Sequence, residues 1–126
     1  MDGFLDTAIL VDVLRGYEPA LAWSQANAHR TFAVTAITWM EVMAGAENAQ
    51  KQRRTGHFLS GFSMEYLTRP DLDWAMMQLA IYHLSHGVGI LDCLIAAPAH
   101  RLQLPLYTRN LKHFTPLLGN LAQQPY

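Results

Sequence analysis

Short β-rich runs alternate with helical segments along the whole chain, and this alternation restricts the folds available to it. Each run of two to five residues is followed by segments whose apolar residues recur every three or four positions. The predicted strands cover residues 4–5, 31–35, 64–67 and 106–108, and the clearest predicted helices cover 70–86 and 90–102. Strands separated by helices form a parallel sheet covered by helices. We therefore expect a three-layer α/β/α fold with a short, mainly parallel sheet of four or five strands.

Length and composition narrow the class of protein. The 126 residues suit a single domain, 1–126, and a hydrophobic content of 51% is enough for a core. Charged residues make up only 15% of the chain, below the roughly 25% of typical soluble domains, so we expect a partner to cover some apolar surface. The single cysteine, the absence of a signal sequence and the absence of a membrane-spanning run favour a cytoplasmic protein with no membrane role.

Three acidic residues lie close to predicted strand ends. Asp6 directly follows the first strand, Glu41 lies one turn into the helix after the second, and Asp92 lies in the first turn of the helix before the fourth. Ligands of parallel sheets bind beyond the carboxyl ends of the strands, so these acids are expected to converge in one cleft. Clustered carboxylates need a cation, and Mg²⁺ or Mn²⁺ suits oxygen ligands. The chemistry this favours is phosphodiester hydrolysis by metal-activated water.

Each acid also has a purely structural interpretation. Asp6 can cap a helix, Glu41 can complete a capping box with Thr38, and Asp92 can complement a helix dipole. Taken singly these interpretations are the more common, but three such acids together favour a site. Asp12 is different, because it lies on a polar helix face and is expected to be solvated.

Four local sequences carry more information than the spacing of the acids. In chain order they are LDTAILVDVLRG at 5–16, TWMEVMAG at 38–45, DCLIAA at 92–97 and LYTRNLKHF at 106–114. With these strings the chain resembles PIN domains over nearly its whole length, and in particular the VapC-like ribonuclease toxins of bacterial toxin–antitoxin modules. The resemblance implies a Mg²⁺-dependent endoribonuclease that is inhibited by a cognate antitoxin. It assigns catalysis to Asp6, Glu41 and Asp92, with Asp6 and Asp92 as metal ligands and Glu41 as a second-site ligand or water-orienting base.

The segment after the last predicted strand supplies further candidates for substrate binding or for support of the acids. Thr108 is expected to direct its hydroxyl into the cleft or to cap the next turn, and Arg109 to meet RNA phosphates or to be solvated. PIN domains often carry a fourth acid here, whereas this chain has Asn110 and His113. Because Asn110 adds no charge, we expect one firmly held ion and a second only when RNA is bound.

Two other functions remain open on the sequence. Ala8 stands where PIN domains usually have a polar residue, and Pro98 interrupts a predicted helix. Together with Asn110 they permit a catalytically weakened module that binds RNA or protein. A phospho-receiver domain is another α/β fold with acids at strand ends, although it expects a lysine where this chain has Arg109.

Apolar and basic segments mark candidate partner surfaces. The 70–86 helix has two apolar stripes, so one face can pack on the core and the other on an antitoxin or a second copy in a homodimer. The proposed contact residues are Trp39, Trp74, Met77, Ile81 and Leu84. A second candidate RNA path consists of Lys51, Arg53 and Arg54.

Overall fold

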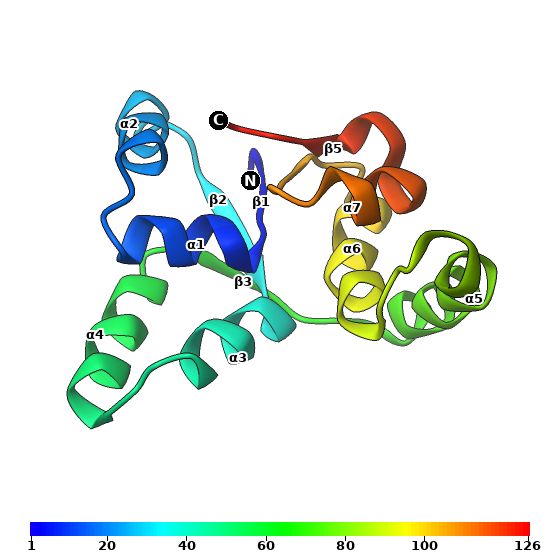
Figure 1. The fold of residues 1–126 in the computed structure, drawn as a ribbon, viewed down its shortest axis with the longest axis horizontal. Coiled ribbons are helices and arrows are strands. Elements are labelled where there is room, and N and C mark those ends of the chain that lie inside the picture. The colour runs from blue at the N-terminus through cyan, green and yellow to red at the C-terminus, as the bar shows by residue number, and fades with distance from the viewer.

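The computed structural model describes all residues, 1–126, and contains five strands and seven α-helices (Figure 1). The strands are β1 (Gly3–Leu5), β2 (Phe32–Thr35), β3 (Ser63–Glu65), β4 (Leu106–Tyr107) and β5 (Ala122–Gln123). The helices are α1 (Thr7–Leu14), α2 (Glu18–Ala26), α3 (Ala36–Ala44), α4 (Ala49–Leu59), α5 (Arg69–His86), α6 (Ile90–Leu102) and α7 (Leu111–Leu118), followed by a 3₁₀ turn, Gly119–Leu121. The predicted alternation is confirmed. The sequence pattern does not predict α7 or β5, because α7 contains Pro116 and β5 is only two residues long.

The sheet has the strand order β3-β2-β1-β4-β5, and all of its strand pairs are parallel. Phe4 on the central strand pairs with Ala33 on one side and Leu106 on the other. The chain thus moves outward from β1 to β3 and then returns to the opposite side of β1, which makes the β1–β4 boundary the switch point where ligands of such sheets bind. A receiver domain has the order 2-1-3-4-5, so the receiver alternative is wrong.

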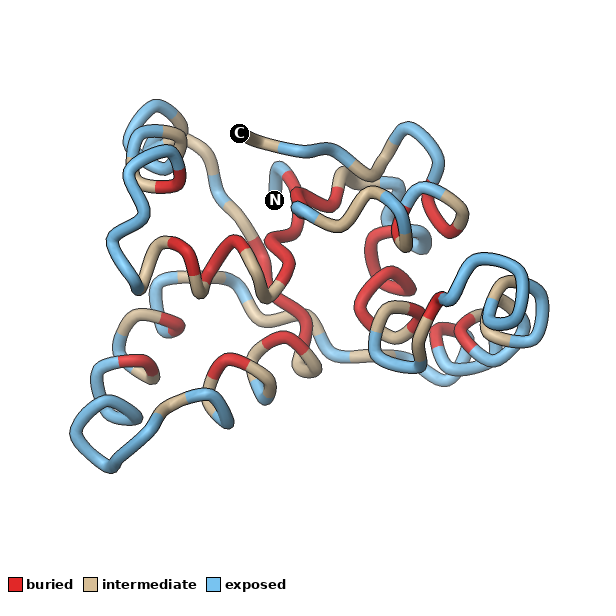
Figure 2. Tube along the Cα trace, in the orientation of Figure 1, coloured by how far each residue is buried: buried red, intermediate tan, exposed pale blue.

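Alternate residues of the strands pack on opposite faces of the sheet. Phe4, Ala33 and Leu106 face α5, α6 and α7, whereas Leu5, Val34 and Tyr107 face the core formed with α1, α3 and α4. Figure 1 shows α1, α2 and α4 on one side of the sheet and α5, α6 and α7 on the other, and Figure 2 shows the buried turns of α1 and α6 beside the strands. The predicted three-layer α/β/α fold is confirmed.

Two helices are capped by the residue at the end of the preceding strand. Asp6 caps α1, its Oδ1 accepting the Thr7 N–H at 2.8 Å. Thr35 caps α3, its Oγ1 accepting the Thr38 N–H at 3.1 Å. The predicted capping box between Thr38 and Glu41 is therefore wrong, because α3 starts directly at the end of β2 and Thr38 already lies inside it. The side chain of Glu41 is left free for another role.

Helices α5 and α6 dock on each other through a buried acid. Asp71, which forms a capping box with Thr68 at the start of α5, also accepts the Arg101 Nε–H from α6 at 3.0 Å. Helix α6 continues through the buried Pro98 without interruption, from Ile90 to Leu102. None of the helices combines the length and apolar character needed to cross a bilayer.

Candidate active site

Asp6 lies at the carboxyl end of β1, on the switch point of the sheet. Its side chain is almost fully buried, at 6% exposure, and its Oδ2 accepts the Thr108 hydroxyl at 2.8 Å. Burial raises the pKa of Asp6; the hydrogen bonds from Thr108 and Thr7 lower it, and the charges of Glu41 and Asp92 raise it further, with a net upward shift. The site therefore holds an anion that is poorly solvated and close to two other anions, which a cation would stabilise.

Glu41 extends from α3 to the first residue of α1. Its Oε1 accepts the Thr7 hydroxyl at 2.6 Å, while its Oε2 has no hydrogen-bond partner. Thr7 thus joins two of the predicted acids, with its backbone on Asp6 and its side chain on Glu41. The sequence patterns do not single out Thr7 as a candidate site residue, although its position directly after Asp6 at the end of β1 is a usable signal.

Asp92 lies in the first turn of α6, as predicted, and its two oxygens differ in their surroundings. The Oδ2 atom accepts the Gly89 N–H at 2.9 Å and lies 3.1 Å from Nδ1 of His113. The Oδ1 atom has no hydrogen-bond partner. The helix-start role considered for Asp92 is therefore present, and it occupies only one oxygen of the carboxylate.

The donor set fits a hard divalent cation but is not assembled around one. No three His, Cys, Asp or Glu side chains lie close enough together to hold a metal ion. Each acid nevertheless retains unpaired oxygen lone pairs, at Asp92 Oδ1, at Glu41 Oε2 and on both oxygens of Asp6. Mg²⁺ commonly binds through one or two carboxylates and keeps several waters, so it does not need a preformed cage of three.

Residues of the segment after β4 form hydrogen bonds that hold the candidate acids in place. The buried Thr108 donates to Asp6 and accepts the Asn110 N–H at 3.0 Å, so its hydroxyl makes both the cleft contact and the turn contact. The side-chain amide of Asn110 lies 3.0 Å from Nδ1 of His113. Thr108 contacts Asp6, and Asn110 contacts His113, which in turn contacts Asp92.

Arg109 turns away from these contacts and pairs with Asp12. Its Nη1 donates to Asp12 Oδ2 at 2.9 Å, and the Tyr126 hydroxyl donates to the same oxygen at 2.7 Å. The hydrogen bond to Asp12 raises the pKa of Arg109. Asp12 is only 8% exposed, so its predicted solvation is wrong. The partners that cover it lie 97 and 114 positions away, which no local helix pattern can reveal.

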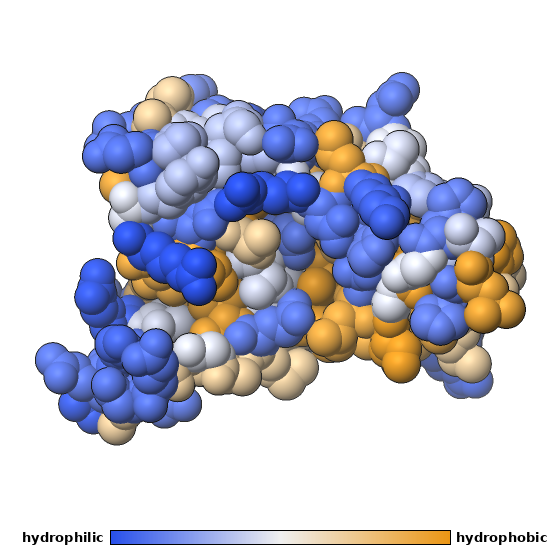
Figure 3. Space-filling view, in the orientation of Figure 1, coloured by the Kyte–Doolittle hydropathy of each residue, from blue (hydrophilic) through white to orange (hydrophobic).

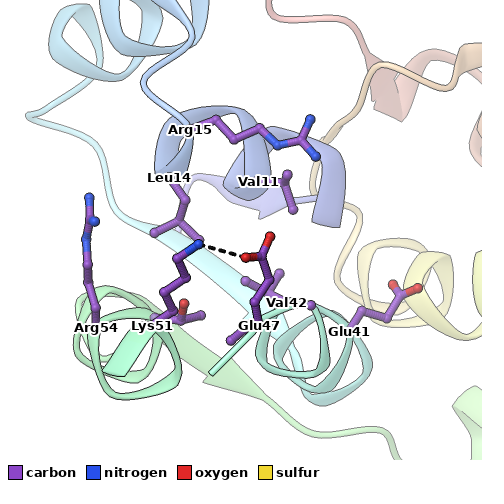
Figure 4. A pocket seen from close by; sticks show the side chains of 11 residues that line it. Val11, Leu14, Arg15, Glu41, Val42, Glu47, Lys51 and Arg54 are labelled. Atoms are coloured by element: carbon purple, nitrogen blue, oxygen red, sulfur yellow. Dashed lines mark hydrogen bonds and ion pairs between the residues drawn. The ribbon is translucent and has the colours of Figure 1, made fainter. Parts of the chain in front are cut away.

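A groove opens beside Glu41 between α1, α3 and α4 (Figure 4). Its volume is about 480 Å³, and its apolar lining consists of Val11, Leu14, Val42 and Ala46. Its polar rim consists of Arg15, Glu41, Glu47, Lys51, Arg54 and Thr55. The Lys51 ammonium pairs with Glu47 at 2.9 Å, the dashed line in Figure 4, whereas Arg15 and Arg54 have no ion-pair partner. Two of the three bases of the second predicted RNA path therefore line a groove that has an apolar floor.

The predicted outer stripe of α5 is only partly correct. Met77, Ile81 and Leu84 are exposed, but Trp74 is half-buried and stacks on His100 with the ring centroids 4.6 Å apart. Trp39 is also half-buried and packs against the core beneath α3. Ala75 and Leu79 pack inward against the core. Leu72 and Met76 are exposed, so they belong to the exposed apolar face of α5 as well.

The parallel sheet and the acids at its switch point define a PIN-like α/β domain. The family model for the PIN domain matches residues 3–114, and the chain therefore belongs to the PIN domain family, as its four local sequences indicate.

Solved structures support this assignment. The chain is similar to a toxin–antitoxin complex from Klebsiella pneumoniae, with 30% identity, a TM-score of 0.78 and coverage of 98% of both chains. It is also similar to DNA-bound VapBC from Salmonella typhimurium, with 25% identity, a TM-score of 0.71 and coverage of 90% of this chain and 91% of that one. FitAcB from Neisseria gonorrhoeae shares the fold, with 24% identity, a TM-score of 0.74 and coverage of 90% and 91%. No curated protein sequence matches the chain.

Proposed function

We propose that this chain is a divalent-metal-dependent endoribonuclease that acts in the cytoplasm as the toxin of a toxin–antitoxin pair. PIN domains are generally nucleases, and the Klebsiella pneumoniae relative is described as a toxin–antitoxin complex. The observation that carries the proposal is the buried carboxylate of Asp6, which lies on the switch point under the influence of Glu41 and Asp92. Burial of a charge among like charges is costly, and a bound cation would remove most of that cost.

The three acids have different proposed roles in the reaction. Asp6 and Asp92 would hold Mg²⁺ or Mn²⁺, since both offer unpaired oxygen lone pairs. When bound, the ion lowers the pKa of water and neutralises charge that develops on the phosphodiester. Glu41 is held at Oε1 by Thr7, so its Oε2 is free to orient a water molecule and accept its proton.

The three predicted residues after β4, Thr108, Arg109 and Asn110, have different proposed roles. Thr108 and Asn110 support the acids through hydrogen bonds. Arg109 keeps an exposed guanidinium that can contact an RNA phosphate, in competition with Asp12.

The groove beside Glu41 is our proposed docking site for the antitoxin. An apolar floor favours a protein segment over RNA, because the groove has no aromatic side chain on which a base could stack. Acidic side chains of that segment can pair with Arg15 and Arg54, which lack ion-pair partners. Since Glu41 is part of the rim, an occupied groove also covers one of the catalytic acids.

The exposed apolar face of α5 is our proposed homodimer contact. Hydrophobic atoms gather over this helix at the right edge of Figure 3, and Leu84 is 96% exposed. The face contains Leu72, Met76, Met77, Ile81 and Leu84. The exposed Asp73 is the one charged side chain within the span of these residues, so burial of apolar surface must supply most of the contact, and a second copy that presents the same face can supply it.

The experiment that tests the activity is cleavage of a mixed RNA pool by the full chain with Mg²⁺, Mn²⁺ or EDTA, beside DNA of the same sequences. Asp6→Asn and Asp92→Asn are the test variants, and Asp73→Asn, at an exposed acid of α5, is the matched control. We expect wild type and Asp73→Asn to cleave RNA only with metal, and the two test variants to lose cleavage. Equal turnover by wild type and Asp92→Asn would overturn the proposal, and RNA binding without cleavage would favour the weakened-module alternative.

A further inference from the structure

His113 contacts the candidate metal ligand Asp92 from a different element. It lies in the first turn of α7, and its Nδ1 is 3.1 Å from Asp92 Oδ2 at the start of α6. The Gly89 N–H approaches the same oxygen at 2.9 Å. Two groups therefore converge on Oδ2, and Oδ1 is the oxygen left for an outside ligand.

The carboxylate determines which nitrogen of His113 carries a proton. A bare lone pair on Nδ1 would face an anionic oxygen and be repelled by it, whereas an Nδ1–H donates to it. The Asn110 atom placed 3.0 Å from the same nitrogen is Nδ2, so the amide must be turned by 180° to present its oxygen to an Nδ1–H. The consistent arrangement has Nδ1–H of His113 shared between Asp92 and the Asn110 amide oxygen.

This contact is one end of a hydrogen-bonded chain that joins both candidate metal ligands. From Asp92 the chain passes through Nδ1 of His113, which contacts both Asp92 and the side chain of Asn110. The Asn110 N–H donates to the Thr108 hydroxyl, which donates to Asp6. The segment 108–113 can therefore fix the relative orientation of two carboxylates that lie 86 positions apart in the sequence.

We propose that His113 is a positioning residue that directs the free Oδ1 of Asp92 toward the divalent ion. The inference rests on the proposed function, in which Asp92 is a metal ligand. Groups that hold a ligating carboxylate from behind fix its orientation, and their loss typically lowers metal affinity about 10- to 100-fold. We expect that range for loss of the His113 contact.

Metal affinity of the full chain tests the inference, with Mn²⁺ as the probe and electron paramagnetic resonance as the readout. His113→Leu removes the donor at similar size, whereas His113→Asn places an amide N–H where Nδ1 lies. His57→Ala, at an exposed histidine of α4, is the control. We expect His113→Leu to lose about 10- to 100-fold in affinity and His113→Asn and His57→Ala to stay near wild type. Wild-type affinity in His113→Leu overturns the inference.

A second measurement needs neither metal nor RNA. The ¹⁵N resonances of the neutral imidazole distinguish the two tautomers of His113. We expect Nδ1–H in wild type and Nε2–H in Asp92→Ala, and Nε2–H in wild type overturns the inference. Absence of RNA cleavage together with intact Mn²⁺ binding and the Nδ1–H tautomer would count against the proposed function and leave the role of His113 standing.

Discussion

Asp6, a proposed metal ligand, is expected to lower stability when no cation is bound. Asparagine at this position can still accept the Thr7 N–H and can donate to the Thr108 hydroxyl, and it caps helices as well as aspartate does. It removes the buried charge whose cost appears as the raised pKa. We therefore predict that Asp6→Asn unfolds at a higher urea concentration than wild type in EDTA at pH 7, while it loses RNA cleavage. A lower urea midpoint would show that the buried charge is already compensated in the metal-free chain.

Glu41 offers a cleaner separation of catalysis from folding. In Glu41→Gln the side-chain oxygen can still accept the Thr7 hydroxyl, so we expect little change in the free energy of unfolding. Loss of a group that accepts a proton from water lowers turnover about 10²- to 10⁴-fold. Single-turnover cleavage at saturating metal measures this effect. Glu47→Gln, at an exposed acid of the same groove, is the control that should cleave normally.

The sequence predicts the positions of the candidate acids better than it predicts their partners. Asp6, Glu41 and Asp92 can be proposed from the sequence because each stands at a fixed offset from a strand or helix start, which local patterns reveal. The bonds of Thr7 to Glu41 and of Asp12 to Tyr126 span 34 and 114 positions, so they exist only after folding. Local pattern therefore supports the choice of acids but not the prediction that Asp12 is solvated.

Among the elements, the α5–α6 pair depends on ionisation of Asp71. Burial raises the pKa of Asp71, but the hydrogen bond and charge of Arg101 and the bonds from Thr68 lower it more, so the net shift is downward. Stability from a carboxylate with a lowered pKa is present above its unfolded value of about 3.9 and is lost as pH falls through the folded value. We predict that the wild-type free energy of unfolding falls below about pH 4 and that Asp71→Asn shows a shallower fall. Urea titrations across this range measure it, with Asp73→Asn as the control that keeps the wild-type slope.

The C-terminal segment is also held by a buried acid, because the Tyr126 hydroxyl donates a hydrogen bond to Asp12 in α1. Tyr126→Phe removes the hydroxyl that donates to Asp12 and keeps the ring that packs beside Tyr17. A hydrogen bond to a charged group contributes about 1.5–3 kcal/mol, so we predict a loss of that size in unfolding free energy. Tyr66→Phe, at an exposed ring, should change stability little when measured by the same urea titration. Equal stability of the two variants would mean that Arg109 alone satisfies Asp12.

How well each element is predicted follows from how locally it is specified. Helix α6 has the predicted bounds 90–102, because Gly89 and Asp92 mark its start and apolar residues recur through it. The α3 start is predicted too late, since its cap is the last residue of a strand and carries a strand-like sequence. β5 consists of Ala122 and Gln123, and only pairing with β4 makes it a strand.

At the scale of the whole molecule, the three surfaces proposed for RNA, an antitoxin and a second copy lie apart from one another. The acids lie at the switch point between the two helical layers, the groove beside Glu41 lies on the α1 side, and the apolar face of α5 lies on the outer side of the opposite layer. A second copy on α5 would therefore leave the groove free for an antitoxin. Dimer formation and antitoxin binding should consequently be separable by mutation.

The double variant Ile81→Glu and Leu84→Glu tests this separation. Both side chains are exposed, so two added charges should leave the fold intact while they oppose burial of the face against a second copy. We predict a dimer for wild type, with twice the chain mass of 14.2 kDa by light scattering, and a monomer for the variant that still unfolds cooperatively, at a melting temperature lowered only by the loss of dimerisation. Gln50→Glu with Gln52→Glu adds the same charge on the exposed part of α4 and should stay dimeric. A monomeric wild type would reject α5 as a self-association face and assign its apolar residues to the antitoxin, in which case the α5 variant would bind the antitoxin more weakly than the α4 control.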